Sequence, residues 1–194
     1  FAQNMLAARG EELRDKTCLV SGAGNVAIYT IEKLYELGAR PVTCSDSRGT
    51  IHDENGIDLG LLKQLKEVQR TSLEAYLHEH PDAHYISARD YPQGGHAIWR
   101  IQADVAFPCA TQNELTESDA EILLANGITC ISEGANMPST KEAVDLFLDA
   151  KIAYGPGKAA NAGGVATSQL EMAQNSSMEQ WPLEKVDQKL KQIM

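Results

Sequence analysis

A glycine-rich segment near the start of the chain has the residue spacing of a phosphate-binding turn. Residues 22–27 read Gly-Ala-Gly-Asn-Val-Ala and fit the pattern Gly-x-Gly-x-x-Gly/Ala. The segment follows an apolar run that predicts a buried strand, and it opens a helical pattern. In this context Gly22 permits a tight turn, Gly24 lets backbone N–H groups approach a pyrophosphate, and Ala27 keeps the helix close to the strand. The segment therefore predicts a dinucleotide site, with an ordinary glycine-rich turn as the weaker interpretation.

An acidic residue, Asp46, follows Gly24 by about 20 residues, at the end of the next predicted strand. A carboxylate at this place accepts a hydrogen bond from the adenine-ribose 2′-hydroxyl of NAD. Short hydroxyls and a guanidinium can instead hold the 2′-phosphate of NADP. The neighbouring residues that supply such groups are Ser45, Ser47, Arg48 and, from the following helix, Arg70. Arg48 can equally be a solvated turn residue, so both cofactors stay open at this point.

Three further loops follow predicted strands, at residues 108–113, 133–138 and 155–164. Open α/β sheets bind ligands at the carboxyl ends of their strands. The side chains suited to hydrogen-bond a nicotinamide ribose or carboxamide are Thr111, Gln112, Asn136 and Asn161. Each loop alone is also explained by turn and capping chemistry, but three loops at one sheet edge favour a ligand.

Other reactive side chains are interpreted as structural. The four cysteines lie in or beside apolar runs without a Cys-x-x-Cys pair, which indicates buried, reduced thiols, and this includes Cys109 beside the expected nicotinamide. The histidines of segment 78–84 resemble a metal cluster but are predicted to be plain surface. Lys158 is the only lysine in the three loops, and no partner in its loop orients it for catalysis. We predict no metal site.

The elements that position these residues alternate between short strands and longer helices. Strands are predicted at 17–21, 40–45, 85–87, 104–108, 128–132 and 152–154, and helices at 26–37, 59–77, 118–125, 140–148, 165–175 and 183–193. Parallel strands need such long connections, so the pattern predicts an α/β fold: a Rossmann-type, doubly wound, mostly parallel sheet with helices on both faces. A small-residue hinge, 159–164, separates it from extra C-terminal helices.

Composition excludes several classes of protein. The chain of 194 residues carries 27 acidic and 17 basic residues, a formal net charge of −10, which argues against nucleic acid or an anionic membrane as partner. It has no apolar run of the roughly 20 residues that span a bilayer, and no leader pattern, so we expect a cytoplasmic protein. The chain opens inside an amphipathic helical pattern, and we expect it to be part of a longer polypeptide.

Four segments together resemble the glutamate dehydrogenases, specifically the small hexameric bacterial and fungal type. They are Ser-Gly-Ala-Gly-Asn-Val-Ala at 21–27, Pro-Cys-Ala-Thr-Gln-Asn-Glu-Leu at 108–115, Glu-Gly-Ala-Asn-Met-Pro at 133–138, and Gly-Lys-Ala-Ala-Asn-Ala-Gly-Gly-Val-Ala-Thr-Ser at 157–168. The resemblance implies that residues 1–194 are the C-terminal NAD(P)-binding domain of a homohexameric enzyme. In that family the domain closes over a separate N-terminal domain, which carries the glutamate pocket and the catalytic lysine and aspartate. It implies reversible oxidative deamination of L-glutamate to 2-oxoglutarate and ammonium, with no catalytic residue in this part.

The resemblance also implies roles for individual residues. The pyrophosphate site is Gly22, Gly24, Asn25 and Val26; the wall facing the nicotinamide and its ribose is Ala110, Thr111, Gln112, Asn136 and Asn161; Val165 and Ser168 reach the substrate. The stretch Ser45-Asp46-Ser47, with Gly49, is similar to the NADP-preferring branch, so NADP is expected, with NAD as the alternative. One departure is the lysine expected near the end of helix 59–77, where Gln69 and Arg70 stand.

Two other functions remain open from the sequence. A branched-chain or aromatic amino-acid dehydrogenase of the same superfamily would have no use for the Ser168 hydroxyl in an apolar pocket. A nucleotide-sensing module would bind a dinucleotide without catalysis.

Overall fold

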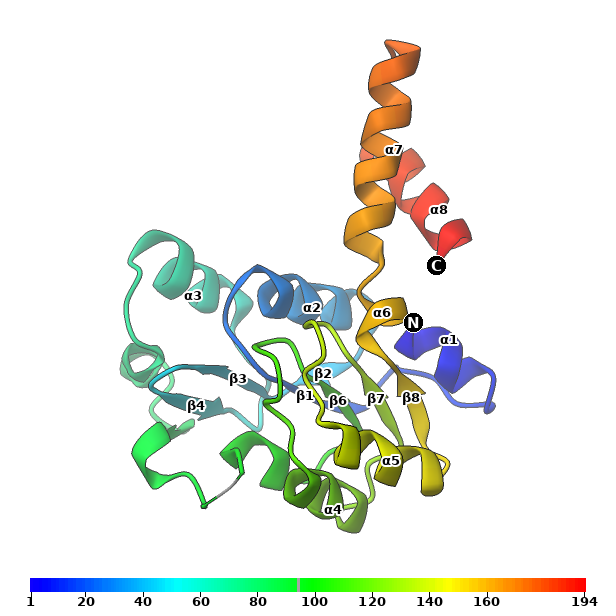
Figure 1. Ribbon diagram of the computed structural model, residues 1–194. Helices are drawn as coiled ribbons and strands as arrows, with labels where there is room; N and C mark the ends of the chain where they lie inside the picture. Colours follow the sequence, from blue (N-terminus) through cyan, green and yellow to red (C-terminus); the bar gives the residue numbers. More distant parts are fainter. Residues whose placement is uncertain (94) are drawn as a thin grey trace.

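A five-stranded parallel sheet forms the centre of the computed structural model, which describes residues 1–93 and 95–194 (Figure 1). Its strands, in spatial order, are β2 (Arg40–Pro41), β1 (Thr17–Val20), β6 (Val105–Phe107), β7 (Cys130–Ser132) and β8 (Ala153–Gly155). Each neighbouring pair is parallel. The chain goes from β1 to β2 on one side and later adds β6 on the other. The strand order therefore reverses between β1 and β6, where doubly wound sheets bind ligands.

Helices cover both faces of this sheet, as predicted (Figure 1). One face carries α1 (Ala2–Ala7), α2 (Asn25–Glu36) and α3 (Leu59–Lys63), and the other carries α4 (Glu117–Ala125) and α5 (Lys141–Asp149). Strand β1 serves both faces because successive side chains alternate: Cys18 and Val20 pack in the core with α2, while Leu19 packs in the core with α4 and α5. The prediction of a Rossmann-type doubly wound fold is confirmed.

The predicted strand 40–45 is divided between two sheets, and this part of the prediction is wrong. After Pro41 the chain enters β3 (Thr43–Asp46), which pairs antiparallel with β4 (Gly49–His52), and β4 pairs antiparallel with β5 (His84–Ser87). Asp46 and Gly49 face each other in register, so only Ser47 and Arg48 form the turn of this hairpin. Beside β1, the Thr43 hydroxyl replaces a backbone partner: it accepts from the Val20 N–H at 2.9 Å and donates to the Val20 carbonyl at 3.2 Å.

The predicted helix 59–77 is also wrong as a single element. Helix α3 continues as the π-helical turn η1 (Gln64–Val68), and after a break the chain forms the 3₁₀ helix η2 (Leu73–His78). Arg70 has a left-handed φ of 53°, which ends the first helix. The Ser72 side chain then caps η2 by accepting from the Glu74 N–H at 3.3 Å. Two short 3₁₀ helices, η3 (Ala88–Asp90) and η4 (Ala97–Arg100), lie between β5 and β6.

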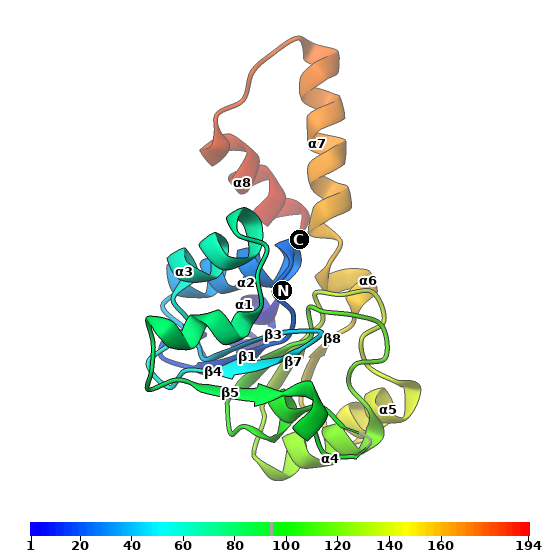
Figure 2. The same ribbon diagram turned by 90° about the vertical axis from the view of Figure 1, so that its left-hand side faces the viewer.

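The C-terminal helices stand apart from the sheet. Helix α6 (Gly157–Ala160) follows β8, α7 (Gly163–Ser177) rises away from the sheet, and α8 (Leu183–Ile193) runs back towards it (Figure 2). An ion pair of 3.9 Å between Lys33 and Asp187 links α8 to α2. In the described part of the chain, no helix combines the length and the apolar character that a membrane span requires.

Candidate functional site

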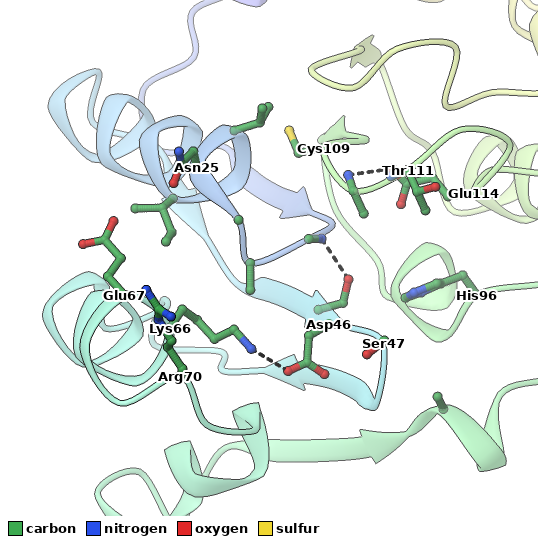
Figure 3. Close-up of a pocket in the computed structure, with 18 of the residues that line it drawn as sticks. Asn25, Asp46, Ser47, Lys66, Glu67, Arg70, His96, Cys109, Thr111 and Glu114 are labelled. Atoms are coloured by element: carbon green, nitrogen blue, oxygen red, sulfur yellow. Dashed lines mark hydrogen bonds and ion pairs between the residues drawn. The ribbon is translucent and has the colours of Figure 1, made fainter.

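A cavity of about 940 Å³ opens where the strand order reverses (Figure 3). Its wall combines segments that follow β1, β3 and β6 with residues of η1 and of the segment between β5 and β6. The residues that line it include Gly22, Gly24, Asn25, Val26, Asp46, Ser47, Lys66, Arg70, Ala88, Tyr91, His96, Ala110, Thr111 and Glu114. Eight of the predicted cofactor residues are among them, although they come from three separate loops.

The turn after β1 has the features of an anion site. Gly22 has a φ of 85°, and a Cβ there would lie 3.0 Å from the Cys109 carbonyl oxygen, so only glycine fits. The Gly22 N–H donates to Ser45 Oγ at 2.9 Å, which ties the turn to β3. Gly24 precedes the first residue of α2. Among the described residues, no side chain caps this helix, and no atom beyond the two chain neighbours of Gly24 lies within 4 Å of a Cβ built on it. The N-terminal N–H groups of α2 are therefore open to a phosphate.

Asp46 is held by a cation and by backbone N–H groups. Its Oδ2 lies 2.9 Å from Lys66 Nζ (Figure 3), and its Oδ1 accepts from the Arg48 N–H at 2.9 Å. Partial burial by itself raises the pKa of Asp46, but the hydrogen bonds and the charge of Lys66 outweigh it and the pKa is lowered. The carboxylate is thus ionised and engaged on both oxygens, and the Lys66 ammonium lies on the cavity wall.

Lys66 is a site residue that the sequence reasoning missed. A lysine was expected near the end of the predicted helix 59–77, where Gln69 and Arg70 stand. Because the helix breaks at Arg70, the last turn before the break carries Lys66, and Arg70 also lines the cavity. A helix that ends at Val68, nine residues before the predicted end at residue 77, would have placed Lys66 in its last turn.

Arg48 is a turn residue, which is one of the two interpretations that the sequence left open. It is exposed in the two-residue turn between β3 and β4 and is not among the residues of the cavity wall, whereas Ser47 is. In the structure Arg48 contacts Asp46 through its backbone N–H. The tight hairpin is the cause, since Asp46 and Gly49 are already paired on either side of the turn.

The loop after β6 is held by a second acidic residue that the sequence reasoning missed. Glu114 Oε1 accepts from the Ala110 N–H at 2.9 Å and from the Thr111 N–H at 3.3 Å, and the Cys109 N–H donates to Ser21 Oγ at 2.8 Å. Burial raises the pKa of Glu114 more than the hydrogen bonds it accepts lower it. These bonds fix Ala110 and Thr111 at the cavity wall.

A second cavity of about 790 Å³ adjoins the first and shares Asn25, Val26 and Cys109 with it. Asn161 lines this cavity and donates from Nδ2 to the Asn136 side-chain oxygen at 2.8 Å. Asn136 and Gln112 are exposed and belong to neither wall. Of the predicted nicotinamide-side residues, the structure thus brings Ala110, Thr111 and Asn161 to the cavities.

The remaining reactive groups are buried or engaged elsewhere. All four cysteines are free and buried, as predicted, and burial raises the pKa of the Cys109 thiol to about 12, so this thiol is protonated and unreactive. His80 lies near two carboxylates, 3.5 Å from Asp53 and 3.3 Å from Asp58. Within residues 1–93 and 95–194, no three histidine, cysteine or acidic side chains are grouped so that they could hold a metal ion.

The two predicted substrate residues lie on α7, outside both cavities. Val165 is 68% exposed, and Ser168, also exposed, donates from Oγ to the Gly164 carbonyl at 3.3 Å. Helix α7 carries them away from the sheet (Figure 2).

A family model, related sequences and solved structures each match this chain over all or nearly all of its length. The family model for Glutamate/Leucine/Phenylalanine/Valine dehydrogenase matches residues 1–194. The chain is 58% identical over 194 residues to an NADP-specific glutamate dehydrogenase of Helicobacter pylori. The match spans 100% of this chain and 43% of that protein. It is 52% identical over 197 residues to an NAD(P)-specific glutamate dehydrogenase of Xylanibacter ruminicola, again 100% of the chain and 43% of the relative.

Among solved structures, Plasmodium falciparum glutamate dehydrogenase 2 superimposes with a TM-score of 0.91 at 44% identity, over 99% of this chain and 41% of that one. The chain therefore spans less than half the length of these relatives.

Proposed function

The chain belongs to the glutamate/leucine/phenylalanine/valine dehydrogenase family, and we propose that residues 1–194 are the dinucleotide-binding domain of an NADP-dependent glutamate dehydrogenase. The full-length enzyme would interconvert L-glutamate with 2-oxoglutarate and ammonium. The observation that carries the proposal is the cavity in which the open N-terminus of α2 lies beside Asp46 and its cation Lys66. The relatives of Helicobacter pylori and Xylanibacter ruminicola, an NADP-specific and an NAD(P)-specific glutamate dehydrogenase, support the same substrate and cofactor.

The cavity residues suit the parts of NADP. The N–H groups at the start of α2 would hold the pyrophosphate, since a helix N-terminus stabilises negative charge. Ser47, Lys66 and Arg70 would hold the 2′-phosphate with one hydroxyl and two cations. Asp46 already has a partner on each oxygen, which makes it a poor acceptor for the free 2′-hydroxyl of NAD. These features favour NADP over NAD.

The nicotinamide half would lie along Ala110, Thr111 and Asn161. Glu114 fixes the first two through their N–H groups, so this wall is preformed. Bound cofactor would supply the hydride acceptor or donor of the reaction. Gln112 and Asn136, exposed here, would act only if the full-length protein encloses them.

Helix α7 would contact the substrate. Ser168 would donate a hydrogen bond to the side-chain carboxylate of glutamate, and Val165 would contact its aliphatic part, once the rest of the longer enzyme covers them. Lys158 is exposed at the start of α6. We assign no catalytic role to it and propose that the acid–base groups belong to the remainder of the enzyme. The C-terminal position of this domain, the hexamer and the cytoplasmic location remain predictions for the full-length protein.

The decisive experiment compares the full-length enzyme with residues 1–194 alone. The full-length protein is expected to oxidise NADPH with 2-oxoglutarate and ammonium, and not with branched-chain or aromatic 2-oxo acids. The isolated chain is expected to bind NADPH in a fluorescence titration without consuming it. NADPH consumption by the isolated chain that Lys158→Ala abolishes would move the chemistry into this chain. Binding by the full-length protein without any turnover would favour a nucleotide sensor.

A further inference from the structure

One side of the cavity of about 940 Å³ makes none of the proposed contacts with the phosphates, the ribose or the nicotinamide. It consists of Ala88, Tyr91 and His96, which belong to the segment between β5 and β6 and line the same cavity as Asp46 and Ser47. His96 extends from the start of η4 towards the cavity, on the side opposite Lys66 (Figure 3). The following inference rests on the proposed dinucleotide function, because it assigns this wall to one part of that ligand.

The hydrogen bonds of His96 determine which ring nitrogen carries the proton. His96 precedes η4, and its Nδ1 accepts from the Ile98 N–H at 3.3 Å. A ring nitrogen that accepts a hydrogen bond has no proton, so the neutral imidazole carries its N–H on Nε2. The His96 backbone N–H donates to Asp119 Oδ1 at 3.0 Å, which fixes the start of η4 against α4. The ring therefore presents a single, oriented donor.

The imidazole is neutral at physiological pH. Burial lowers the pKa of His96 to about 4, and the nearby charge of Asp119 raises it only in part. Asp119 is fully buried and pairs with Arg100 at 3.1 Å, so its charge is already compensated. A neutral Nε2–H suits an uncharged acceptor better than a phosphate, which the cations across the cavity would hold.

Aromatic packing holds the ring in place. The rings of Tyr91 and His96 lie 4.4 Å apart at 51°, and the Tyr91 hydroxyl is hydrogen-bonded to Thr50 of β4. The centroid of the Trp99 ring lies 6.2 Å from that of His96. Tyr91 thus adds an aromatic surface whose polar group is already satisfied, and the wall combines apolar ring surface with one donor.

We propose that Ala88, Tyr91 and His96 form the base subsite of the dinucleotide, and that His96 Nε2 donates a hydrogen bond to a ring nitrogen of adenine. With the pyrophosphate at the start of α2 and the adenine ribose at Asp46, as proposed, the base would continue past the ribose within the same cavity. Adenine is planar, uncharged and has unprotonated ring nitrogens that accept hydrogen bonds. These properties match an aromatic wall with one neutral donor.

The test uses the two halves of the cofactor as separate ligands of the full-length protein, measured by isothermal titration calorimetry. The probes are 5′-AMP and 2′,5′-ADP for the adenosine half and nicotinamide mononucleotide for the other half. His96→Ala is expected to weaken both adenosine ligands by the same factor, about tenfold, with nicotinamide mononucleotide unchanged. His96→Phe keeps a ring without the donor and should lose as much, whereas His96→Gln restores a donor and should recover part of the affinity. The exposed His78→Ala serves as the matched control.

The outcomes separate this inference from the proposed function. If the wild-type protein binds neither adenosine ligand, the proposed function fails. If it binds both and the Ala and Phe variants bind them equally well, the base subsite is wrong and the proposed function stands. Equal weakening of nicotinamide mononucleotide would mean a general structural effect and would also overturn the subsite. If the His96→Ala variant fails to fold, the affinities of His96→Phe and His96→Gln for the two adenosine ligands are compared instead, and equal affinities would overturn the proposed hydrogen bond.

Discussion

Removing the charge of Lys66 should convert an NADP-preferring cavity into one without that preference. Lys66→Met keeps most of the aliphatic stem but removes the ammonium that lies 2.9 Å from Asp46 Oδ2. Two effects follow for a bound 2′-phosphate: it loses a charge-assisted hydrogen bond, and it faces an Asp46 carboxylate that no cation compensates. For NADH, the freed Asp46 oxygen becomes available to the 2′-hydroxyl.

The magnitude follows from the geometry. A hydrogen bond between charged groups contributes about 1.5 to 3 kcal/mol. For two unit charges roughly 5 Å apart, the repulsion that the lost cation would no longer compensate is roughly 3 kcal/mol at an effective dielectric constant near 20. The Lys66 side chain is 21% exposed and Asp46 is 14% exposed, so solvent screens the repulsion in part. We therefore expect NADPH to bind at least about 100-fold more weakly, while NADH changes by less than about threefold.

The assay is a pair of fluorescence titrations, with NADPH and with NADH, on the full-length protein. Lys63→Met is the matched control, because Lys63 lies one turn earlier and pairs with Glu32 at the same 2.9 Å without lining the cavity. Arg48→Ala should also leave both affinities nearly unchanged, since its side chain lies outside the cavity wall. Equal losses for the two cofactors, or an NADPH affinity within about threefold of the wild type, would refute the assignment of Lys66 to the 2′-phosphate.

Three further predictions concern other parts of the chain. The hydrogen bonds and the charge of Lys66 hold the pKa of Asp46 below its ordinary value of 3.8, so its contribution to stability is complete above that value and is lost as pH falls through the folded-state pKa. Urea melts between about pH 5 and pH 2 should therefore fall less steeply for Asp46→Asn than for the wild type, and parallel curves would contradict this. Burial raises the pKa of Cys18, Cys109 and Cys130 to about 12, so iodoacetamide at pH 8 should alkylate none of them in the native protein and all of them in urea, as read by mass spectrometry. Ser168→Ala should raise the KM for glutamate by the equivalent of about 1.5 to 3 kcal/mol without changing NADPH affinity; unchanged glutamate kinetics would remove Ser168 from the substrate site.

The sequence by itself determined the features that depend on neighbouring residues. The strand–turn–helix order around Gly22 follows from the period of the apolar residues and from a backbone conformation, φ of 85°, that only glycine adopts easily. The cap of α5 is equally local, since Thr140 accepts from the Ala143 N–H three residues later. The parallel sheet with helices on both faces was predictable for the same reason, because most of its strands and helices follow from the local pattern of apolar residues.

Only the tertiary structure decided the composition of the cavity. The ion pair of Asp46 with Lys66, the bond of Gly22 to Ser45 and the bond of His96 to Asp119 each join residues 20 or more positions apart. The hairpin at Ser47–Arg48 and the left-handed Arg70 also depend on such contacts, since Asp46 accepts from the Leu73 N–H at 3.4 Å, just beyond the helix break. A local pattern carries no information about which distant side chain satisfies a buried polar group. Lys66 and His96 were therefore identified as residues of the cavity from the folded structure and not from the sequence pattern.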